Sequence, residues 1–527
     1  MRRLGSFNVF VMLMLAGALQ AASLAWPWAV PASLQWLGLV RGQALWWMQI
    51  AALAVLVRLL LDASSSRQAA WRGWVFAVAW LAVTFAWLYT SMHVYGGLVS
   101  PLAAAAVLVL AGGLASYTAL ACWAFWPLAQ INQRFVPLFF GALWLLAEWA
   151  RGTWLSGFGW GAVGYAHVSG PLSPLIAWVG LYGTSALAGG FAALLALATK
   201  AHMFRARATY GMLALGGLAL AAVVPAHHGT DQGVLQVTLL QGNIGQEEKF
   251  QPSTGVPKAL SWYAQQLLAA QGSLVVTPET AVPLLPGQLP EGYFRALRER
   301  FFSGQQAALV GIPLGSFSEG YTNSIVGLRP EDESVWRYDK HHLVPFGEFI
   351  PPFFRWFTDL MNIPLGDFNR GALPQPTFDW AGQRLAATVC YENLFTEELA
   401  TQFTDAAKAP TVLVNISNMG WFGEHLAMDQ HLQIARMRSL EFDRPFLLAT
   451  NTGRTAIVDH RGRVTHQVPS HAQAVLQGDV TGRAGITPYA AWVSAHGLLP
   501  LWVGALAVVF AGAWVRRRHL ERAANPV

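Results

Sequence analysis

The chain has 527 residues, of which 54% are hydrophobic and only 12% are charged. Soluble domains carry about 25% charged residues, so the composition predicts that much of this chain faces lipid. The formal net charge is only +6, and the basic residues collect beside apolar runs, so a nucleic-acid partner is not expected. The two cysteines, Cys122 and Cys390, lie in different contexts and indicate no disulfide framework.

Eight apolar runs are candidates for membrane-spanning helices, because a span needs about 20 apolar residues and somewhat shorter spans are tolerated. A signal peptide is the alternative for the first run, but that run is long and further spans follow it directly. The second run contains Arg58 and the fifth is short, so these two are the weakest candidates, and residues 26–43 could hold a re-entrant segment. The runs lie near 7–25, 44–61, 73–91, 100–126, 136–150, 173–198, 209–225 and 493–515.

The basic residues follow alternate runs, and cytoplasmic loops carry the excess of Lys and Arg. This pattern predicts that both chain ends are cytoplasmic and that the long stretch between the seventh and eighth runs lies outside. We therefore expect a membrane domain at 1–229 with about seven transmembrane helices, an extracytoplasmic domain at 230–487, and a transmembrane helix with a basic cytoplasmic tail at 488–527. The basic residues are Arg2, Arg3, Arg67, Arg72, Arg134, Lys200, Arg205, Arg207, Arg516, Arg517, Arg518 and Arg522.

The stretch from 230 to 487 alternates short apolar runs with longer helical patterns. Helices are expected at Lys258 to Ala270 and Met428 to Phe442, and a hairpin at Arg454 to Val458 with the turn that follows it. Short apolar runs separated by helices indicate an α/β domain with buried sheets. The expected strands lie at 234–240, 273–276, 307–310, 385–389 and 411–414.

Three motifs in this domain place one reactive side chain each at or just beyond the end of an extended stretch. They are Thr277-Pro278-Glu279, Asp339-Lys340 with the residues up to Glu348, and Val389-Cys390-Tyr391-Glu392. A thiol nucleophile needs a base that takes its proton and a cation that stabilises the oxyanion. Glu279, Lys340 and Cys390 supply these parts.

Each of these residues also has a plainer alternative: Cys390 as an inert core thiol, Lys340 as a surface charge, Glu279 as a turn cap. The presence of all three motifs favours the catalytic interpretation. Cys122, inside an apolar run, is expected to be inert. His341-His342 suggests a metal at first, but adjacent histidines diverge and no third ligand lies at zinc spacing, so we expect no metal site.

Several further motifs occur in an order that resembles the apolipoprotein N-acyltransferase family, within the nitrilase or carbon–nitrogen hydrolase superfamily. The resemblance covers nearly the whole chain. It implies a polytopic α-helical membrane domain joined to an extracytoplasmic α-β-β-α sandwich. The additional matching stretches are Arg151-Gly152, Gly157-Phe158, Gln241-Gly242-Asn243-Ile244, Ser417-Asn418, Trp421-Phe422-Gly423, His431 to Leu440 and Asn451-Thr452-Gly453.

The resemblance implies ping-pong acyl transfer with no cofactor. Glu279 would act as general base, Lys340 would hold the oxyanion and favour the thiolate, and Cys390 would carry the acyl chain as a thioester. The implied donor is a phospholipid, with phosphatidylethanolamine expected, and the implied acceptor is the α-amine of the diacylglyceryl-cysteine that begins an apolipoprotein. The expected location is the bacterial inner membrane with the catalytic domain in the periplasm. Supporting roles fall to Glu348, Tyr391 and Glu392.

Lipid contact is expected at a few aromatic residues. The segment Phe349 to Gly366 resembles an amphipathic lid, with an ordinary surface loop as the alternative, and Phe250 stands where the family usually has Trp. Two other functions stay open: a membrane-anchored carbon–nitrogen hydrolase (amidase), and an inactive scaffold that binds lipoproteins or lipid. The expected lipid-binding residues are Phe250, Phe353, Phe354, Trp356, Phe357 and Trp421.

Overall fold

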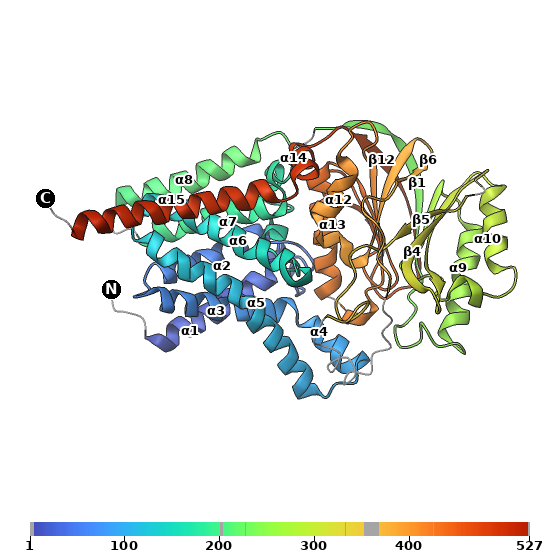
Figure 1. Cartoon of the computed structure of the whole chain (residues 1–527), viewed down its shortest axis with the longest axis horizontal. Helices are drawn as coiled ribbons and strands as arrows, with labels where there is room; N and C mark the ends of the chain where they lie inside the picture. The colour runs from blue at the N-terminus through green and yellow to red at the C-terminus, as the bar shows by residue number, and fades with distance from the viewer. Residues whose placement is uncertain are drawn as a thin grey trace. The chain divides into compact units, whose positions relative to one another are not determined.

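The computed structural model describes residues 5–200, 204–226, 228–332, 334–351, 368–424 and 426–524. The chain forms two compact units (Figure 1). The helical unit comprises Met1–Tyr89, Ser100–Ala226 and His496–Val527, and the α/β unit comprises Thr90–Val99 and His227–Ala495. The short segment Thr90–Val99 therefore packs with the α/β unit, although it lies in sequence between two helices of the other.

Each of the eight apolar runs contains a long helix or most of one. The predicted run near 73–91 is broken, because α3 ends at Thr84 and the chain continues with α4 (Trp87–Thr90) and the π-helical turn η2 (Ser91–Tyr95). Residues 26–43 contain only a short 3-10 turn, η1 (Ala32–Leu37). The eight helices are α1 (Ser6–Ala22), α2 (Trp46–Leu60), α3 (Ser66–Thr84), α5 (Ser100–Ala129), α6 (Val136–Thr153), α7 (Ile176–Lys200), α8 (Phe204–Ala222) and α15 (Leu499–Ala524).

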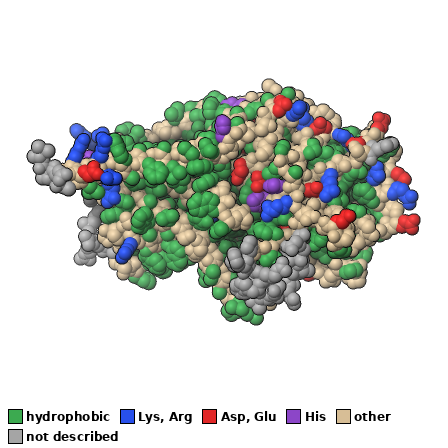
Figure 2. Space-filling model, in the orientation of Figure 1, with side chains coloured by type: hydrophobic (Ala, Val, Ile, Leu, Met, Phe, Trp, Pro, Cys, Tyr) green, Lys and Arg blue, Asp and Glu red, His purple; other side chains and the backbone are tan. Residues whose placement is uncertain are grey.

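The exterior of the helical unit is strongly apolar. Large side chains such as Val109 and Phe510 are 75% and 67% exposed, and Figure 2 shows hydrophobic side chains spread over this unit. Among the described residues, three helical segments are long and apolar enough to cross a membrane, or four if the bent pair Ser66–Thr84 and Trp87–Tyr95 counts as one. Such helices fit a membrane protein; a total of eight spans stays a prediction.

The α/β unit contains two six-stranded sheets. In the first the strand order is β12-β1-β2-β3-β4-β5, and in the second it is β11-β10-β9-β8-β7-β6. All five predicted strands are confirmed as β1, β2, β3, β7 and β8, and the predicted hairpin is confirmed as β10 and β11. The strands are β1 (Thr230–Gln241), β2 (Leu274–Val276), β3 (Ala307–Ser316), β4 (Gly320–Leu328), β5 (Trp336–Asp339), β6 (Phe378–Trp380), β7 (Gln383–Val389), β8 (Val412–Ser417), β9 (Phe446–Thr450), β10 (Ala456–Val458), β11 (Val464–Gln467) and β12 (Ala474–Ala484).

The two sheets face each other between two layers of helices (Figure 1). Successive side chains of a strand point to opposite faces, so in β1 Leu239 joins the core between the sheets while Leu240 packs under the outer helices. The helices α9 (Gly255–Ala269) and α10 (Tyr293–Phe302) cover the first sheet, and α13 (Leu426–Phe442) lies against the second. The unit is thus an α-β-β-α sandwich, in agreement with the predicted fold.

Candidate active site

The predicted reactive residues follow the ends of three different strands. Glu279 comes three residues after β2, and Lys340 and Cys390 directly follow β5 and β7. Because β7 and β8 are parallel neighbours, Cys390 and Asn418 leave adjacent strand ends. Cys390 has a φ of 52°, which is sparsely populated for a residue with a side chain. The chain therefore turns sharply at the thiol.

Lys340 joins two carboxylates at the centre of the site. Its side chain is 1% exposed, and its Nζ lies 3.5 Å from Glu279 Oε1 and 2.8 Å from Glu348 Oε2. The amide of Asn323 in β4 donates to both carboxylates, at 2.7 Å to Glu279 and 2.8 Å to Glu348. Burial acts to lower the pKa of Lys340, but attraction to Glu348, Glu279 and Cys390 outweighs it and raises the pKa. The ammonium charge is therefore kept at neutral pH.

Two further contacts fix the position of Glu279. Its Oε2 accepts a hydrogen bond from the backbone N–H of Asn418 at 2.7 Å. Its main-chain oxygen accepts one from Lys249 Nζ at 2.9 Å, and the same ammonium donates to Thr280 Oγ1 at 2.5 Å. Thr280 has a φ of 47°, so the buried Lys249 holds a strained turn directly after the carboxylate.

Burial lowers the pKa of Lys249 to about 8, although Glu279 and Cys390 act in the opposite direction. The turn around Glu279 also packs closely against Gly311 of β3. A Cβ at that position would collide with the main chain of Pro278 and Thr280, so a glycine is needed there.

Cys390 is partly exposed, and its thiol is held in the protonated form. Burial raises its pKa, and the charge of Glu279 and of Glu348 raises it further, while Lys340 and the Asn418 N–H lower it. The charge of Lys340 lowers the pKa of the thiol, but the effects that raise it are larger. A thiol in this setting needs a base that takes its proton before it can act as a strong nucleophile.

The main chain around Cys390 is held by Asn415, which lies outside the predicted motifs, and by His431, which begins one of the matching stretches. Asn415 Nδ2 donates to the carbonyl oxygen of Cys390 at 3.3 Å, and His431 also bonds to the Cys390 backbone. Neither Asn415 nor Asn323 was predicted. The available signal is a polar side chain inside a buried strand, since β4 contains Thr322-Asn323-Ser324 and β8 contains Asn415 between apolar residues.

Glu392 connects two segments of the site through hydrogen bonds. Its carboxylate accepts from the backbone N–H groups of Val389 (2.6 Å), His341 (2.7 Å) and His342 (3.1 Å), and from the Tyr338 hydroxyl (2.9 Å). These bonds tie the strand end that carries Cys390 to the loop that carries Lys340. Glu392 is therefore placed to support the geometry.

The other expected supporting residues have different neighbours. Tyr391 packs against Phe395 and His342, with ring centroids 5.3 and 5.7 Å apart. Glu348 bonds to Lys340 as described and also accepts from the backbone N–H of Val344 at 2.9 Å. Glu348 thus shares the buried charge cluster, whereas Tyr391 contributes aromatic packing beside it.

The structure describes two of the six expected lipid-binding residues, Phe250 and Trp421. Phe250 is 52% exposed, with Lys249 Nζ 5.7 Å from its ring centroid. Trp421 makes an edge contact with Tyr95, centroid to centroid 5.6 Å. The remaining four, with most of the proposed lid, lie outside the described residues; they are Phe353, Phe354, Trp356 and Phe357.

The adjacent histidines are engaged separately. His341 Nδ1 lies 2.7 Å from the Gly371 carbonyl oxygen and His342 Nδ1 lies 2.7 Å from Glu398 Oε1. In the part of the chain that the structure describes, no group of three His, Cys, Asp or Glu side chains could hold a metal ion.

The two-sheet α/β unit belongs to the class of carbon–nitrogen hydrolase domains. The family model described as "Carbon-nitrogen hydrolase" matches residues 236–489, and the one described as "Apolipoprotein N-acyltransferase N-terminal domain" matches residues 31–194. The chain belongs to the apolipoprotein N-acyltransferase family.

Full-length relatives support this assignment. The chain is 53% identical to the apolipoprotein N-acyltransferase of Verminephrobacter eiseniae over 510 residues, which cover 92% of each chain. It is 44% identical to that of Ralstonia nicotianae over 482 residues, 90% of each. A solved amidase from Nesterenkonia sp. is similar at 15% identity with a TM-score of 0.36, over 51% of this chain and 94% of that one, too low a similarity to add to the assignment.

Proposed function

We propose that this protein moves an acyl chain from a phospholipid to the α-amine of the diacylglyceryl-cysteine that begins an apolipoprotein. The observation that carries the proposal is the buried cluster in which Lys340 binds both Glu279 and Glu348 and acts electrostatically on the Cys390 thiol. The membership of the family supplies the substrate classes.

In the first half-reaction Glu279 takes the proton of the Cys390 thiol while the sulfur attacks the ester carbonyl of the phospholipid. The carbonyl oxygen becomes an oxyanion, which the Lys340 ammonium and a backbone N–H after Cys390 stabilise. The carbon–oxygen bond to the glycerol then breaks, and Glu279 returns the proton to the leaving oxygen. The products are a lysophospholipid and a Cys390 thioester.

In the second half-reaction the acceptor amine attacks the thioester carbonyl. Glu279 takes one amine proton, the carbon–sulfur bond breaks, and the proton passes to the departing sulfur. The result is an amide on the acceptor and a regenerated Cys390 thiol. Each half-reaction uses Glu279 as base and then as acid, so one carboxylate serves both.

The apolar helices fit substrates that are themselves held in a bilayer. Extraction of an acyl chain into water costs about 0.8 kcal/mol per CH₂ group, and anchorage at the membrane avoids that cost. We place the α/β unit on the periplasmic side of the bacterial inner membrane because of the distribution of Lys and Arg. Phosphatidylethanolamine is the proposed donor.

The test is conversion of a synthetic diacylated lipopeptide by the purified full chain in detergent with phosphatidylethanolamine. We expect triacylated lipopeptide and lysophospholipid in equal amounts, and neither product with a Cys390→Ala variant. Release of free fatty acid with no triacylated product would contradict acyl transfer and would favour a hydrolase instead.

A further inference from the structure

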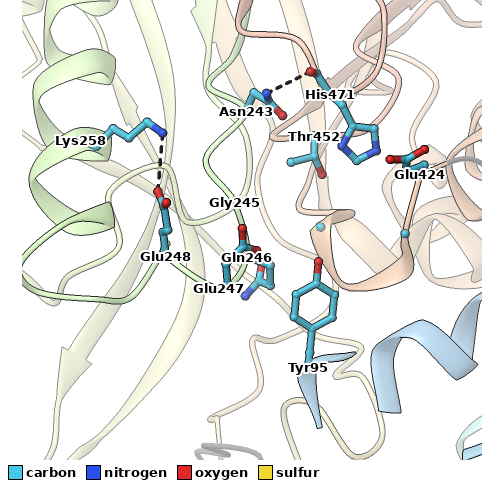
Figure 3. Close-up of a pocket in the computed structure, with 12 residues that line it drawn as sticks. Tyr95, Asn243, Gly245, Gln246, Glu247, Glu248, Lys258, Glu424, Thr452 and His471 are labelled. Carbon is cyan, nitrogen blue, oxygen red and sulfur yellow. Dashed lines mark hydrogen bonds and ion pairs between the residues drawn. The ribbon is translucent and has the colours of Figure 1, made fainter. Parts of the chain in front are cut away.

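The α/β unit contains a polar cavity of about 400 Å³ whose walls come from segments far apart in sequence (Figure 3). Gln246 and Glu247 follow β1, Glu424 follows the turn after β8, and Thr452 follows β9. Tyr95 comes from the segment Thr90–Val99, which belongs to the same unit. The volume lies in the range of about 300–1,000 Å³ that is usual for ligand sites.

The lining is acidic. It contains three glutamates, Glu247, Glu248 and Glu424, and one lysine, Lys258, whose Nζ lies 3.6 Å from Glu248. With His471 counted as neutral, three carboxylates and one ammonium leave two negative charges. A phosphate group would meet repulsion here, whereas ammonium groups and peptide N–H donors would be attracted.

One polar atom in each of two buried side chains of the lining lacks a hydrogen-bond partner among the described residues. Gln246 is 6% exposed and Thr452 is 4% exposed, and neither Gln246 Nε2 nor Thr452 Oγ1 has a hydrogen-bond partner among the described residues. A buried polar group without a partner is destabilising, because it has lost its hydrogen bonds to water. A ligand that brings a hydrogen-bond acceptor to the Gln246 amide would remove that destabilisation, and the carbonyl oxygens of a peptide are such acceptors.

The cavity wall is linked directly to the proposed base. Asn418 donates its side-chain N–H to Gln246 Oε1 at 2.7 Å and its backbone N–H to Glu279 Oε2 at 2.7 Å. Asn418 therefore connects the lining residue Gln246 directly to Glu279, the carboxylate that would take the amine proton.

We infer that this cavity binds the peptide segment that follows the modified cysteine of the acceptor, and that its two excess negative charges favour cationic segments. The inference rests on the proposed function for the identity of the acceptor. The peptide fits the lining better than a phospholipid headgroup does, because a headgroup would place its phosphate among carboxylates.

Binding can be measured without turnover in the full chain that carries Cys390→Ala. The probes are dye-labelled diacylated lipopeptides in neutral detergent, with three lysines or three glutamates after the modified cysteine. The cationic peptide should bind about tenfold more tightly, the effect of one charge-assisted contact. Glu247→Gln with Glu424→Gln should abolish this preference, whereas Glu299→Gln, an exposed glutamate on α10 outside the cavity, should retain it.

Lys258→Gln gives an independent test of opposite sign, because it makes the lining more negative and should increase the preference. Equal affinity for the two peptides, or a preference that survives the double glutamine change, would overturn the inference. A lower affinity for phospholipid alone in that double variant would assign the cavity to the donor and overturn it as well. If the wild-type protein forms no triacylated product, the proposed function is contradicted. The peptide preference measured with Cys390→Ala does not depend on that assay.

Discussion

Removal of the Lys340 ammonium should destabilise the protein and slow the formation of the acyl-enzyme, for separate reasons. In Lys340→Met, the buried carboxylates of Glu279 and Glu348 would lose the cation between them. Only the side-chain amide of Asn323 would still bind both, with its Nδ2 2.7 Å from Glu279 Oε1 and 2.8 Å from Glu348 Oε1. Loss of one partner of a buried ion pair costs about 3–5 kcal/mol. At about 2–4 °C per kcal/mol for a domain of this size, the unfolding midpoint should fall by about 6–20 °C.

The deficit should shrink as the pH falls. In the variant the paired carboxyl groups hold a proton more tightly in the folded chain than in the unfolded chain, so the folded state gains stability as the pH is lowered. Formation of the acyl-enzyme should slow by about 10²–10³ at neutral pH, because the oxyanion loses its main cationic partner.

A second change separates the two effects. Lys340→Met combined with Glu348→Gln removes the repulsion and should recover at least half of the lost unfolding temperature, with no recovery of acylation. The measurements are the unfolding midpoint in detergent, followed by tryptophan fluorescence, and the rate of acyl-enzyme formation. An unchanged midpoint in the single variant, or a double variant that unfolds no higher than the single one, would refute this reasoning.

Three further outcomes are expected. Burial lowers the pKa of His431 to about 4, so the folded state should lose stability as the pH falls below about 6.5. The variant His431→Gln should reduce that loss at pH 5 by about 2 kcal/mol. An unfolding midpoint with the same pH dependence in the variant as in the wild type would contradict this. Lys249→Met removes the bond to the main chain of Glu279 and should slow acylation about tenfold, whereas a wild-type rate would show that the turn holds without it. Reporter fusions near Gly233 and Arg516 should report opposite sides of the membrane, and the same side for both would contradict the predicted topology.

The fold of the α/β unit was predictable where buried strands appear in the sequence as runs of apolar residues. Strands such as β2 and β8 are buried on both faces, so they appear as continuous apolar runs. The edge strand β12 pairs only with β1 and has two exposed polar residues, Gln477 and Asp479, so it gave no such signal. The membership of Thr90–Val99 in the α/β unit depends on tertiary contacts that no local pattern records.

The same distinction applies to the site. Glu279, Lys340 and Cys390 were predictable because each ends or follows a strand within a specific motif. Asn323 and Lys249 were not predictable as site residues. Their contacts with Glu279 join positions that are 44 and 30 residues apart in sequence. The protonated state of Cys390 was also not predictable, since it results from burial and two carboxylates that together outweigh one ammonium.

The central claim is that Cys390 carries the acyl chain, and mass spectrometry of the intact protein tests it most directly. After incubation with phosphatidylethanolamine and no acceptor, the account predicts one acyl adduct, located on Cys390, that disappears when diacylated lipopeptide is added. Cys122→Ala, which removes the other thiol, should form the same adduct. Absence of the adduct, or triacylation at the wild-type rate by Cys390→Ala, would contradict the claim.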